Sequence, residues 1–200
     1  MGGKWLNKGY PVEVDGVAVR EYQVWYGVKN RKNYNSTYDN VAVCKEWEDY
    51  GNFYEWVTSQ KGWYAKDVNG RSFTIDKDIK SYITGDPKIY SPETCIIIPN
   101  KINNYFHLNR KLQSNRELPF GVMKSKVYPN KYNSAFDYHN KARHKSCVEE
   151  AQELYLKQKK QGLFDLVDLY RSDLEETTVE LLVSFDFYKY FKESGCNMVV

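Results

Sequence analysis

The feature that most constrains the fold of this chain is a short apolar segment that ends in the charged triplet Asp76-Lys77-Asp78. A second apolar run, Cys95 to Ile98, follows it and is closed by Pro99. Ser91-Pro92-Glu93 stands between the two, with a capping serine, a proline suited to the first helical position and an acid. This pattern predicts a strand, then a helix start or a single turn, then a second strand. The helical spacing of apolar residues over 101–112 predicts a helix after them.

The triplet offers side chains of the kinds that metal binding and proton transfer use. A carboxylate such as that of Asp76 can help to hold a divalent metal ion, and a general base must accept a proton from water. Lys77 is a poor base, because an ammonium group is protonated at neutral pH. Asp78 lies two residues from Asp76, which places both on one face of an extended strand. Asp76, Lys77 and Asp78 are therefore candidate catalytic residues, and the preferred alternative role for Asp78 is a surface salt bridge.

Charge is distributed unevenly along the chain. Residues 1–100 carry 13 basic and 13 acidic side chains, residues 101–160 carry 13 and 5, and residues 161–200 carry 3 and 8. The middle segment is therefore the candidate surface for a polyanion, and its interleaved aromatic residues favour nucleic acid. Lysine and arginine contact phosphate, arginine can also read guanine, and tyrosine can stack or touch the backbone. The candidate DNA-binding residues are Lys124, Lys126, Lys131, Tyr132, Arg143 and Lys145.

The cysteines and the hydropathy pattern exclude several classes of protein. The four cysteines are scattered and form no CxxC pair, which argues against a zinc ribbon or a disulfide scaffold. No apolar run is long enough to span a bilayer, and the N-terminus lacks the core of a signal peptide. We therefore expect a soluble protein of the cytoplasm, without a membrane partner.

Local patterns predict most of the secondary structure of the first half. The alternation in residues 12–19 around Asp15-Gly16 predicts a hairpin, and the aromatic spacing from Arg20 to Val28 predicts a short helix. Residues 41–43 read as a short strand. Aromatic residues from Cys44 to Gln60 recur at helical spacing and are interrupted at Gly51-Asn52, which predicts two helical pieces with a buried apolar stripe.

The second half is predicted to contain a small α+β layer and a helical tail. Residues 120–124, 131–136 and 139–145 read as three antiparallel strands, and residues 148–160 as a helix with acids in its first turn and lysines in its last. Gly162 is predicted to end that helix. Residues 163–174 and 179–191 read as two further helices, rich in acids.

Residues of about 20–110 resemble the HNH-like proteins of tailed phages. The matching phrases include Arg20-Glu-Tyr-Gln-Val-Trp25, Val43-Cys-Lys-Glu-Trp47, Ile75-Asp-Lys-Asp-Ile79, Ile89-Tyr-Ser-Pro-Glu-Thr-Cys95 and Pro99-Asn-Lys-Ile-Asn-Asn104. The resemblance implies a ββα fold that grips one divalent metal, Mg²⁺ or Mn²⁺, against DNA phosphate. Lys77 stands where the histidine base would be and Thr94 near the family's asparagine. The metal ligands implied are Asp76, Asn104 and His107.

Residues of about 118–161 are similar to the DNA-binding domain of plant ethylene-response factors, which also occurs fused to HNH homing endonucleases. Gly121-Val122, Lys131-Tyr132, Ala135-Phe136 and Val148-Glu-Glu-Ala151 with Tyr155 carry the similarity. It implies a three-stranded sheet laid in the major groove of DNA. Both resemblances together predict an α+β chain of an HNH-like module over 1–112, this DNA-binding module over 118–161 and an acidic helical tail over 162–200.

Three functions are compatible with the sequence. The first is a phage-type protein that binds double-stranded DNA on a degenerate HNH nuclease scaffold, in the cytoplasm of the host cell, without efficient cleavage. The second is a metal-dependent endonuclease, nicking or homing, with a non-standard base. The third is a phage inhibitor that binds a host nuclease, polymerase or defence protein through the acidic tail, whose apolar face would otherwise pack on the core or form a homodimer.

Overall fold

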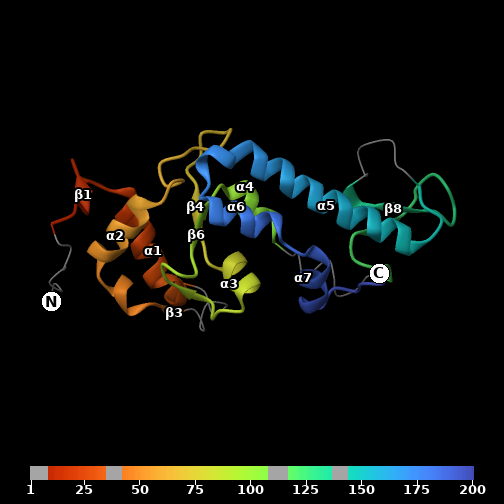
Figure 1. The fold of residues 1–200 in the computed structure, drawn as a ribbon, viewed down its shortest axis with the longest axis horizontal. Helices are drawn as coiled ribbons and strands as arrows, with labels where there is room; N and C mark the ends of the chain where they lie inside the picture. Colours follow the sequence, from red (N-terminus) through yellow and green to blue (C-terminus); the bar gives the residue numbers. More distant parts are fainter. Residues whose placement is uncertain (1–8, 35–41, 108–116, 137–143) are drawn as a thin grey trace. The chain divides into compact units, whose positions relative to one another are not determined.

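The computed structural model describes residues 9–34, 42–107, 117–136 and 144–200. The chain divides into two compact units: unit 1 comprises Met1–Asn104 and Tyr170–Leu181, and unit 2 comprises Tyr105–Leu169 and Leu182–Val200. Helices and two-stranded sheets alternate along the described residues (Figure 1), so the predicted α+β class is confirmed. Among the described residues, no helix combines the length and the apolar character needed to cross a membrane.

The predicted N-terminal hairpin is present in unit 1. Its strands β1 (Glu13–Val14) and β2 (Val17–Ala18) pair antiparallel, and the two residues between them, Asp15 and Gly16, have φ of 50° and 76°. Both dihedrals lie in the left-handed region that the two-residue turn requires, and Asp and Gly tolerate it best. The sequence signal for this turn was therefore sufficient.

Helices follow the hairpin much as the aromatic spacing predicts. Helix α1 covers Arg20–Tyr34 and is longer than the predicted helix. The two predicted helical pieces are the 3₁₀-helix η2 (Lys45–Glu48) and α2 (Tyr50–Ser59). The break falls at Asp49, because its side chain accepts a hydrogen bond from Gly51 N at 2.7 Å and caps α2. Glycine 51 therefore lies inside the helix and does not interrupt it.

Two small sheets complete unit 1. Strand β4 (Thr74–Asp76) pairs antiparallel with β6 (Ile96–Ile98), and β3 (Ala42–Val43) pairs parallel with β5 (Ile89–Tyr90). Helix α3 (Asp78–Thr84) lies between β4 and β5 in the chain and was not predicted, whereas α4 (Asn100–Tyr105) covers the first half of the predicted helix over 101–112. The strand–strand–helix order is thus present, but the finer HNH layout stays a prediction.

Large aromatic side chains fill the core of unit 1. Trp47, Phe53, Trp63 and Phe73 are at most 2% exposed. The Tyr170 ring, at the end of α5 (Val148–Tyr170), packs edge-on against Phe73 with 5.6 Å between ring centroids. The chain continues through η5 (Arg171–Asp173) into α6 (Glu176–Val183). A part of the predicted tail therefore supplies core residues to this unit.

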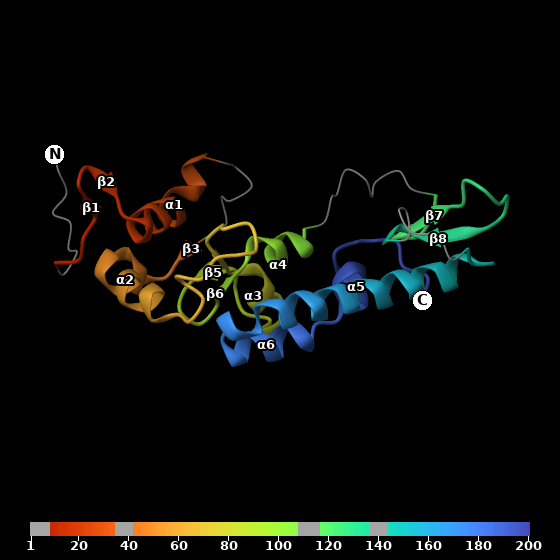
Figure 2. The ribbon, with the colours of Figure 1, turned by 90° about the horizontal axis from the view of Figure 1, so that it is seen from above.

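Unit 2 is built on a hairpin beside the first half of α5 (Figures 1 and 2). Strand β7 (Val122–Lys124) pairs antiparallel with β8 (Tyr132–Ser134), and a single bridge joins Tyr132 to Lys145. The described residues contain two strands and this bridge of the predicted sheet. Residues 137–143 lie outside the described part of the chain. The three-stranded sheet stays a prediction.

Gly162 does not end the helix as predicted, because α5 continues through it to Tyr170. A side chain at this position would overlap the hydroxyl of Tyr105. That hydroxyl donates to Lys159 O at 3.0 Å, and Lys159 Nζ donates back to Tyr105 O at 2.6 Å. Burial lowers the pKa of Lys159 to about 8. The glycine therefore serves a close approach to a buried tyrosine and not a helix end.

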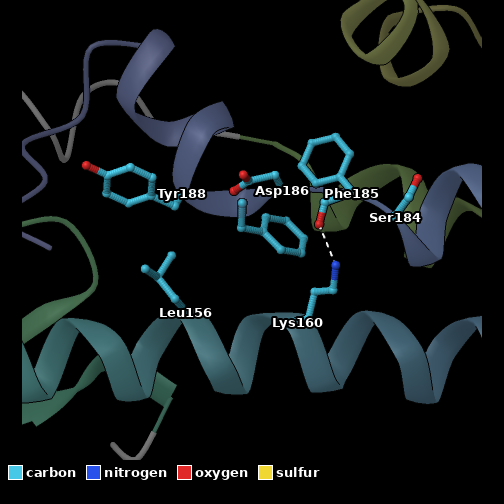
Figure 3. A pocket seen from close by; sticks show the side chains of 7 residues that line it. Leu156, Lys160, Ser184, Phe185, Asp186 and Tyr188 are labelled. Carbon is cyan, nitrogen blue, oxygen red and sulfur yellow. Dashed lines mark hydrogen bonds between the residues drawn. The ribbon is translucent and has the colours of Figure 1, made fainter.

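The predicted helix over 179–191 is broken into α6 and α7 (Phe187–Glu193). Asp186 causes the break, because its side chain accepts from Lys189 N at 3.0 Å and caps α7. Figure 3 shows Lys160 of α5 reaching this link, where its ammonium donates to Phe185 O at 2.7 Å. The hollow of about 360 Å³ beside it is lined by both apolar and polar side chains, of which Lys160 and Asp186 hold the link in place.

We predict that Gly121→Ala destabilises unit 2 strongly. Gly121 has φ +80°, which costs a residue with a side chain about 1–2 kcal/mol, and an added Cβ would also overlap the Tyr155 ring, for about 1–3 kcal/mol more. Gly195→Ala is the matched control, since Gly195 has φ +78° and nothing within 4 Å of an added Cβ. Thermal unfolding followed by circular dichroism should show the larger loss for Gly121→Ala; equal losses would contradict the close packing on Tyr155.

Candidate functional site

Asp76 lies at the end of β4, opposite Ile96 of β6, and is 7% exposed. Its Oδ1 accepts a hydrogen bond from Ile79 N at 2.9 Å, so the carboxylate caps the first turn of α3. Burial raises the pKa of Asp76 above its ordinary value, although the hydrogen bond from Ile79 opposes this. The candidate catalytic carboxylate is therefore already engaged in holding the strand–helix junction.

Lys77 is buried beside Asp76, with 3% of its side chain exposed. Its Nζ lies 2.7 Å from Asp78 Oδ1 and 5.2 Å from the centre of the Tyr90 ring. Asp78 begins α3 and does not continue the strand, so the predicted common strand face of Asp76 and Asp78 is wrong. The side chain of Asp78 is half exposed and also lies 3.9 Å from Lys88. The ammonium of Lys77 thus neutralises the carboxylate next to it.

The turn before β6 surrounds this pair with groups that the sequence did not mark as functional. Tyr90 is buried, which raises the pKa of its hydroxyl, and the Arg31 guanidinium donates to that hydroxyl. Thr94 Oγ1 donates to Ile89 O and lies 3.1 Å from Ser91 Oγ. Burial raises the pKa of Cys95 to about 12. Ser91-Pro92-Glu93 forms a single turn here, which is one of the two predicted outcomes, and its polar groups are satisfied internally.

A divalent metal does not fit the described residues around Asp76. Magnesium prefers several oxygen ligands, carboxylates included. Within residues 9–34, 42–107, 117–136 and 144–200, no group of three or more His, Cys, Asp or Glu side chains could hold a metal ion. Asp76 caps α3, and the Lys77 ammonium already supplies positive charge beside it. Asn104 and His107 are both exposed, and His107 belongs to unit 2, so a ligand set of Asp76, Asn104 and His107 stays a prediction.

Three of the predicted DNA-binding residues form one row across the hairpin of unit 2. Lys124 of β7 lies opposite Tyr132 of β8, and Tyr132 is bridged to Lys145. Backbone hydrogen bonds of 3.0 Å and 2.7 Å between Tyr132 and Lys145 fix the bridge. Directly opposed residues of a sheet share a face, so two lysines flank the tyrosine on one face.

The remaining lysines do not share that face. Val122 and Ser134, two residues along the strands from Lys124 and Tyr132, are buried, and Ser134 Oγ donates to Gln158 of α5. The row therefore extends the face that α5 covers. Lys131, one residue before Tyr132, alternates to the other face, and Lys126 lies in the loop between the strands. The predicted single basic face is thus divided, and Arg143 lies outside the described residues.

The loop between β7 and β8 is held in a defined shape. Ser125 Oγ accepts hydrogen bonds from Val127 N at 3.2 Å and Tyr128 N at 3.0 Å, and Ser125 N donates to Lys131 O at 2.8 Å. Val127 is 69% exposed and Tyr128 is 53% exposed. This tip therefore presents apolar and aromatic groups between Lys126 and Lys131.

No protein-family model matches the chain, and neither does any curated protein or any solved structure. The HNH-like and ethylene-response-factor-like resemblances therefore stay predictions. The described geometry supports function only through the residues themselves. In unit 1, Asp76 caps α3 and Asp78 pairs with Lys77. Unit 2 contains a lysine-rich hairpin.

We predict that Asp76→Asn makes unit 1 more stable at neutral pH. An asparagine can still cap α3, and it removes the cost of burying a charge. Because the pKa of Asp76 is raised on folding, the native state binds more protons than the unfolded state and the wild type loses stability as pH rises above about 4. Denaturant melts at several pH values should show that the free energy of unfolding of Asp76→Asn exceeds that of the wild type by an amount that grows with pH. The exposed Asp86→Asn is the control and should show no such difference.

Proposed function

We propose that the protein binds double-stranded DNA through the basic hairpin of unit 2, on an HNH-like scaffold that does not cleave efficiently. The row of Lys124, Tyr132 and Lys145 is the observation that carries this proposal. Two ammonium groups flanking a tyrosine suit a DNA backbone, because lysine neutralises phosphate and tyrosine can donate a hydrogen bond to it.

The charges of the hairpin are available to an incoming phosphate. Lys124 Nζ lies 3.5 Å from Glu117 Oε2, but the two side chains are 69% and 87% exposed. Such an exposed ion pair contributes little to stability, so exchanging Glu117 for phosphate costs little. Lys126 in the loop and Lys131 on the other face of the hairpin add positive charge outside the row.

The contacts available from the described residues favour binding with little sequence preference. Lysine meets phosphate as a compact charge, whereas arginine reads guanine with two hydrogen bonds. Arg143 is the arginine of the predicted DNA-binding set and lies outside the described residues. Most of the affinity should therefore depend on salt and little on the DNA sequence.

Weak or absent cleavage follows from the surroundings of Asp76. Lys77 Nζ donates to Asp78 Oδ1 at 2.7 Å, and the Asp76 carboxylate is occupied as a cap of α3. The alternative, a metal-dependent endonuclease with a non-standard base, would need Asp76 to leave α3 or a ligand set that includes residues outside the described part.

We predict that Lys124→Ala and Lys145→Ala, which remove the two ammonium groups of the row, each weaken duplex binding and make it less sensitive to salt. Removing one phosphate contact should reduce the slope of log K against log salt by about 0.9. Fluorescence anisotropy with a labelled duplex at several salt concentrations measures this slope. Lys157→Ala is the matched control, because Lys157 is an exposed lysine on α5 of the same unit. Undetectable binding of the wild type at low salt would overturn the proposal.

We also predict that the protein leaves a supercoiled plasmid intact in magnesium, manganese or EDTA. Lys77→His should not create cutting, because the Asp76 carboxylate still caps α3. An agarose gel separates supercoiled from nicked plasmid. Metal-dependent nicks that disappear in Asp76→Ala would instead establish the endonuclease alternative. If the protein neither nicks nor binds the DNA, the result would favour the inhibitor alternative.

A further inference from the structure

Five tyrosines of unit 1 contact one another ring to ring in one aromatic cluster around the buried Tyr50, called here the tyrosine face. They come from the segment before β1, from α1 and from α2: Tyr10, Tyr22, Tyr26, Tyr50 and Tyr54. This surface plays no part in the DNA-binding proposal, which concerns unit 2.

The rings follow one another in an unbroken chain. Tyr10 stacks on Tyr54 with 4.3 Å between ring centroids and 18° between ring planes. Tyr50 meets Tyr54 at 5.9 Å and Tyr22 at 5.5 Å, and Tyr22 meets Tyr26 at 6.2 Å. These separations are those of favourable aromatic pairs. These contacts therefore fix the shape of the face across its three segments of chain.

Internal contacts hold the face rigid while leaving its rim accessible. Tyr50 is buried and its hydroxyl donates to Pro11 O at 2.8 Å, which ties α2 to the segment before the hairpin. Tyr10, Tyr22 and Tyr54 are half-buried, and Tyr26 is 44% exposed. Rigid, partly exposed tyrosines lose little conformational entropy on binding and are enriched at protein interfaces.

Carboxylates surround the tyrosine face. The segments 10–26 and 44–58, which carry the five tyrosines, contain seven acidic residues against Arg20 and Lys45. Arg20 is turned inward, where it donates to Phe73 O at 2.6 Å and covers the Trp63 ring at 3.6 Å. Among the acids, Glu21 is buried and Asp49 caps α2, whereas the exposed ones are Glu13, Asp15, Glu46, Glu48 and Glu55. The exposed charge of these segments is thus negative, with five carboxylates against Lys45, and it repels nucleic acid. Lys29 of α1 adds one ammonium group beside Trp25.

We propose that the tyrosine face binds an arginine- or lysine-rich segment of a partner protein. Cations bind over the faces of tyrosine rings, and the surrounding carboxylates supply the complementary charge. Unit 1 already contains one such contact, since Lys29 Nζ lies 4.7 Å from the centre of the Trp25 ring, which touches Tyr22 at 5.7 Å. Arginine should bind better than lysine, because its planar guanidinium stacks on a ring while it pairs with a carboxylate.

Fluorescence anisotropy with labelled nine-residue peptides tests the proposal. One peptide alternates arginine and glycine, and its counterparts replace arginine by lysine or glutamate. We expect the full-length protein to bind the arginine peptide most tightly, the lysine peptide less tightly and the glutamate peptide not at all. Equal binding of all three peptides would overturn the proposal. Binding of none of them, by a protein that does not self-associate, would also overturn it.

Point variants locate the site on the tyrosine face. Tyr26→Ala and Tyr54→Ala should each weaken binding of the arginine peptide at least about threefold, the loss expected of one exposed cation–π contact. Tyr128→Ala is the matched control, because Tyr128 is 53% exposed and lies in unit 2. Glu55→Gln should also weaken binding, since Gln can still accept the hydrogen bond that Tyr10 donates at 3.0 Å but carries no charge. Its control is exposed Glu93→Gln, which should bind as the wild type does.

Three results would assign the face to something else. Equal losses in Tyr26→Ala and Tyr128→Ala would place the peptide elsewhere and overturn the proposal. Binding of a single-stranded oligonucleotide that Tyr26→Ala abolishes would make the face a nucleic-acid surface, against its charge. Concentration-dependent self-association in analytical ultracentrifugation, lost in Tyr26→Ala and without peptide binding, would make it an interface between copies of this chain. Circular dichroism melts of each variant exclude unfolding as the cause.

Discussion

Both units bury aromatic side chains, and hydrogen bonds from several of their polar atoms join distant segments, although Trp47 Nε1 is buried without such a bond. In unit 1, Trp63 Nε1 donates to Glu21 at 2.7 Å and Trp25 Nε1 donates to Trp47 O at 2.8 Å. In unit 2, the hydroxyls of Tyr105 and Tyr190 donate to backbone carbonyls at 3.0 Å. Each such bond avoids the cost of a buried unpaired donor and fixes one ring against one backbone position. A core of this kind orders segments that are far apart in the sequence.

Burial also makes the centre of Asp76, Lys77 and Asp78 better suited to structure than to catalysis. Asp76 and Lys77 are both buried, and each is satisfied by its own neighbour in the chain, Ile79 N and Asp78. A catalytic acid or metal ligand must remain able to bind something else. The two proposals therefore give the chain two binding surfaces of opposite charge, a basic hairpin for DNA and an acidic tyrosine face for a cationic protein segment.

Local sequence signals predicted the elements whose geometry is decided within a few residues. Asp15-Gly16 specified the hairpin turn, and the acids at Glu149 and Glu150 lie in the first turn of α5 as predicted. Predictions failed where a distant partner decides the outcome. Gly162 was expected to end a helix, yet it lies within α5 because Tyr105 packs against it, and α3 was missed because its cap, Asp76, was interpreted as catalytic.

The sequence by itself determined the α+β class, the basic middle segment and the position of Lys77 between two acids. Composition, residue order and the side-chain periods of 2.0 residues in a strand and 3.6 in a helix are properties of the chain alone. Only the tertiary structure decided which lysines of the hairpin share a face, since that depends on where α5 covers Val122 and Ser134. It also decided that five scattered tyrosines meet in one surface. Contacts between distant residues follow from packing, which no local pattern encodes.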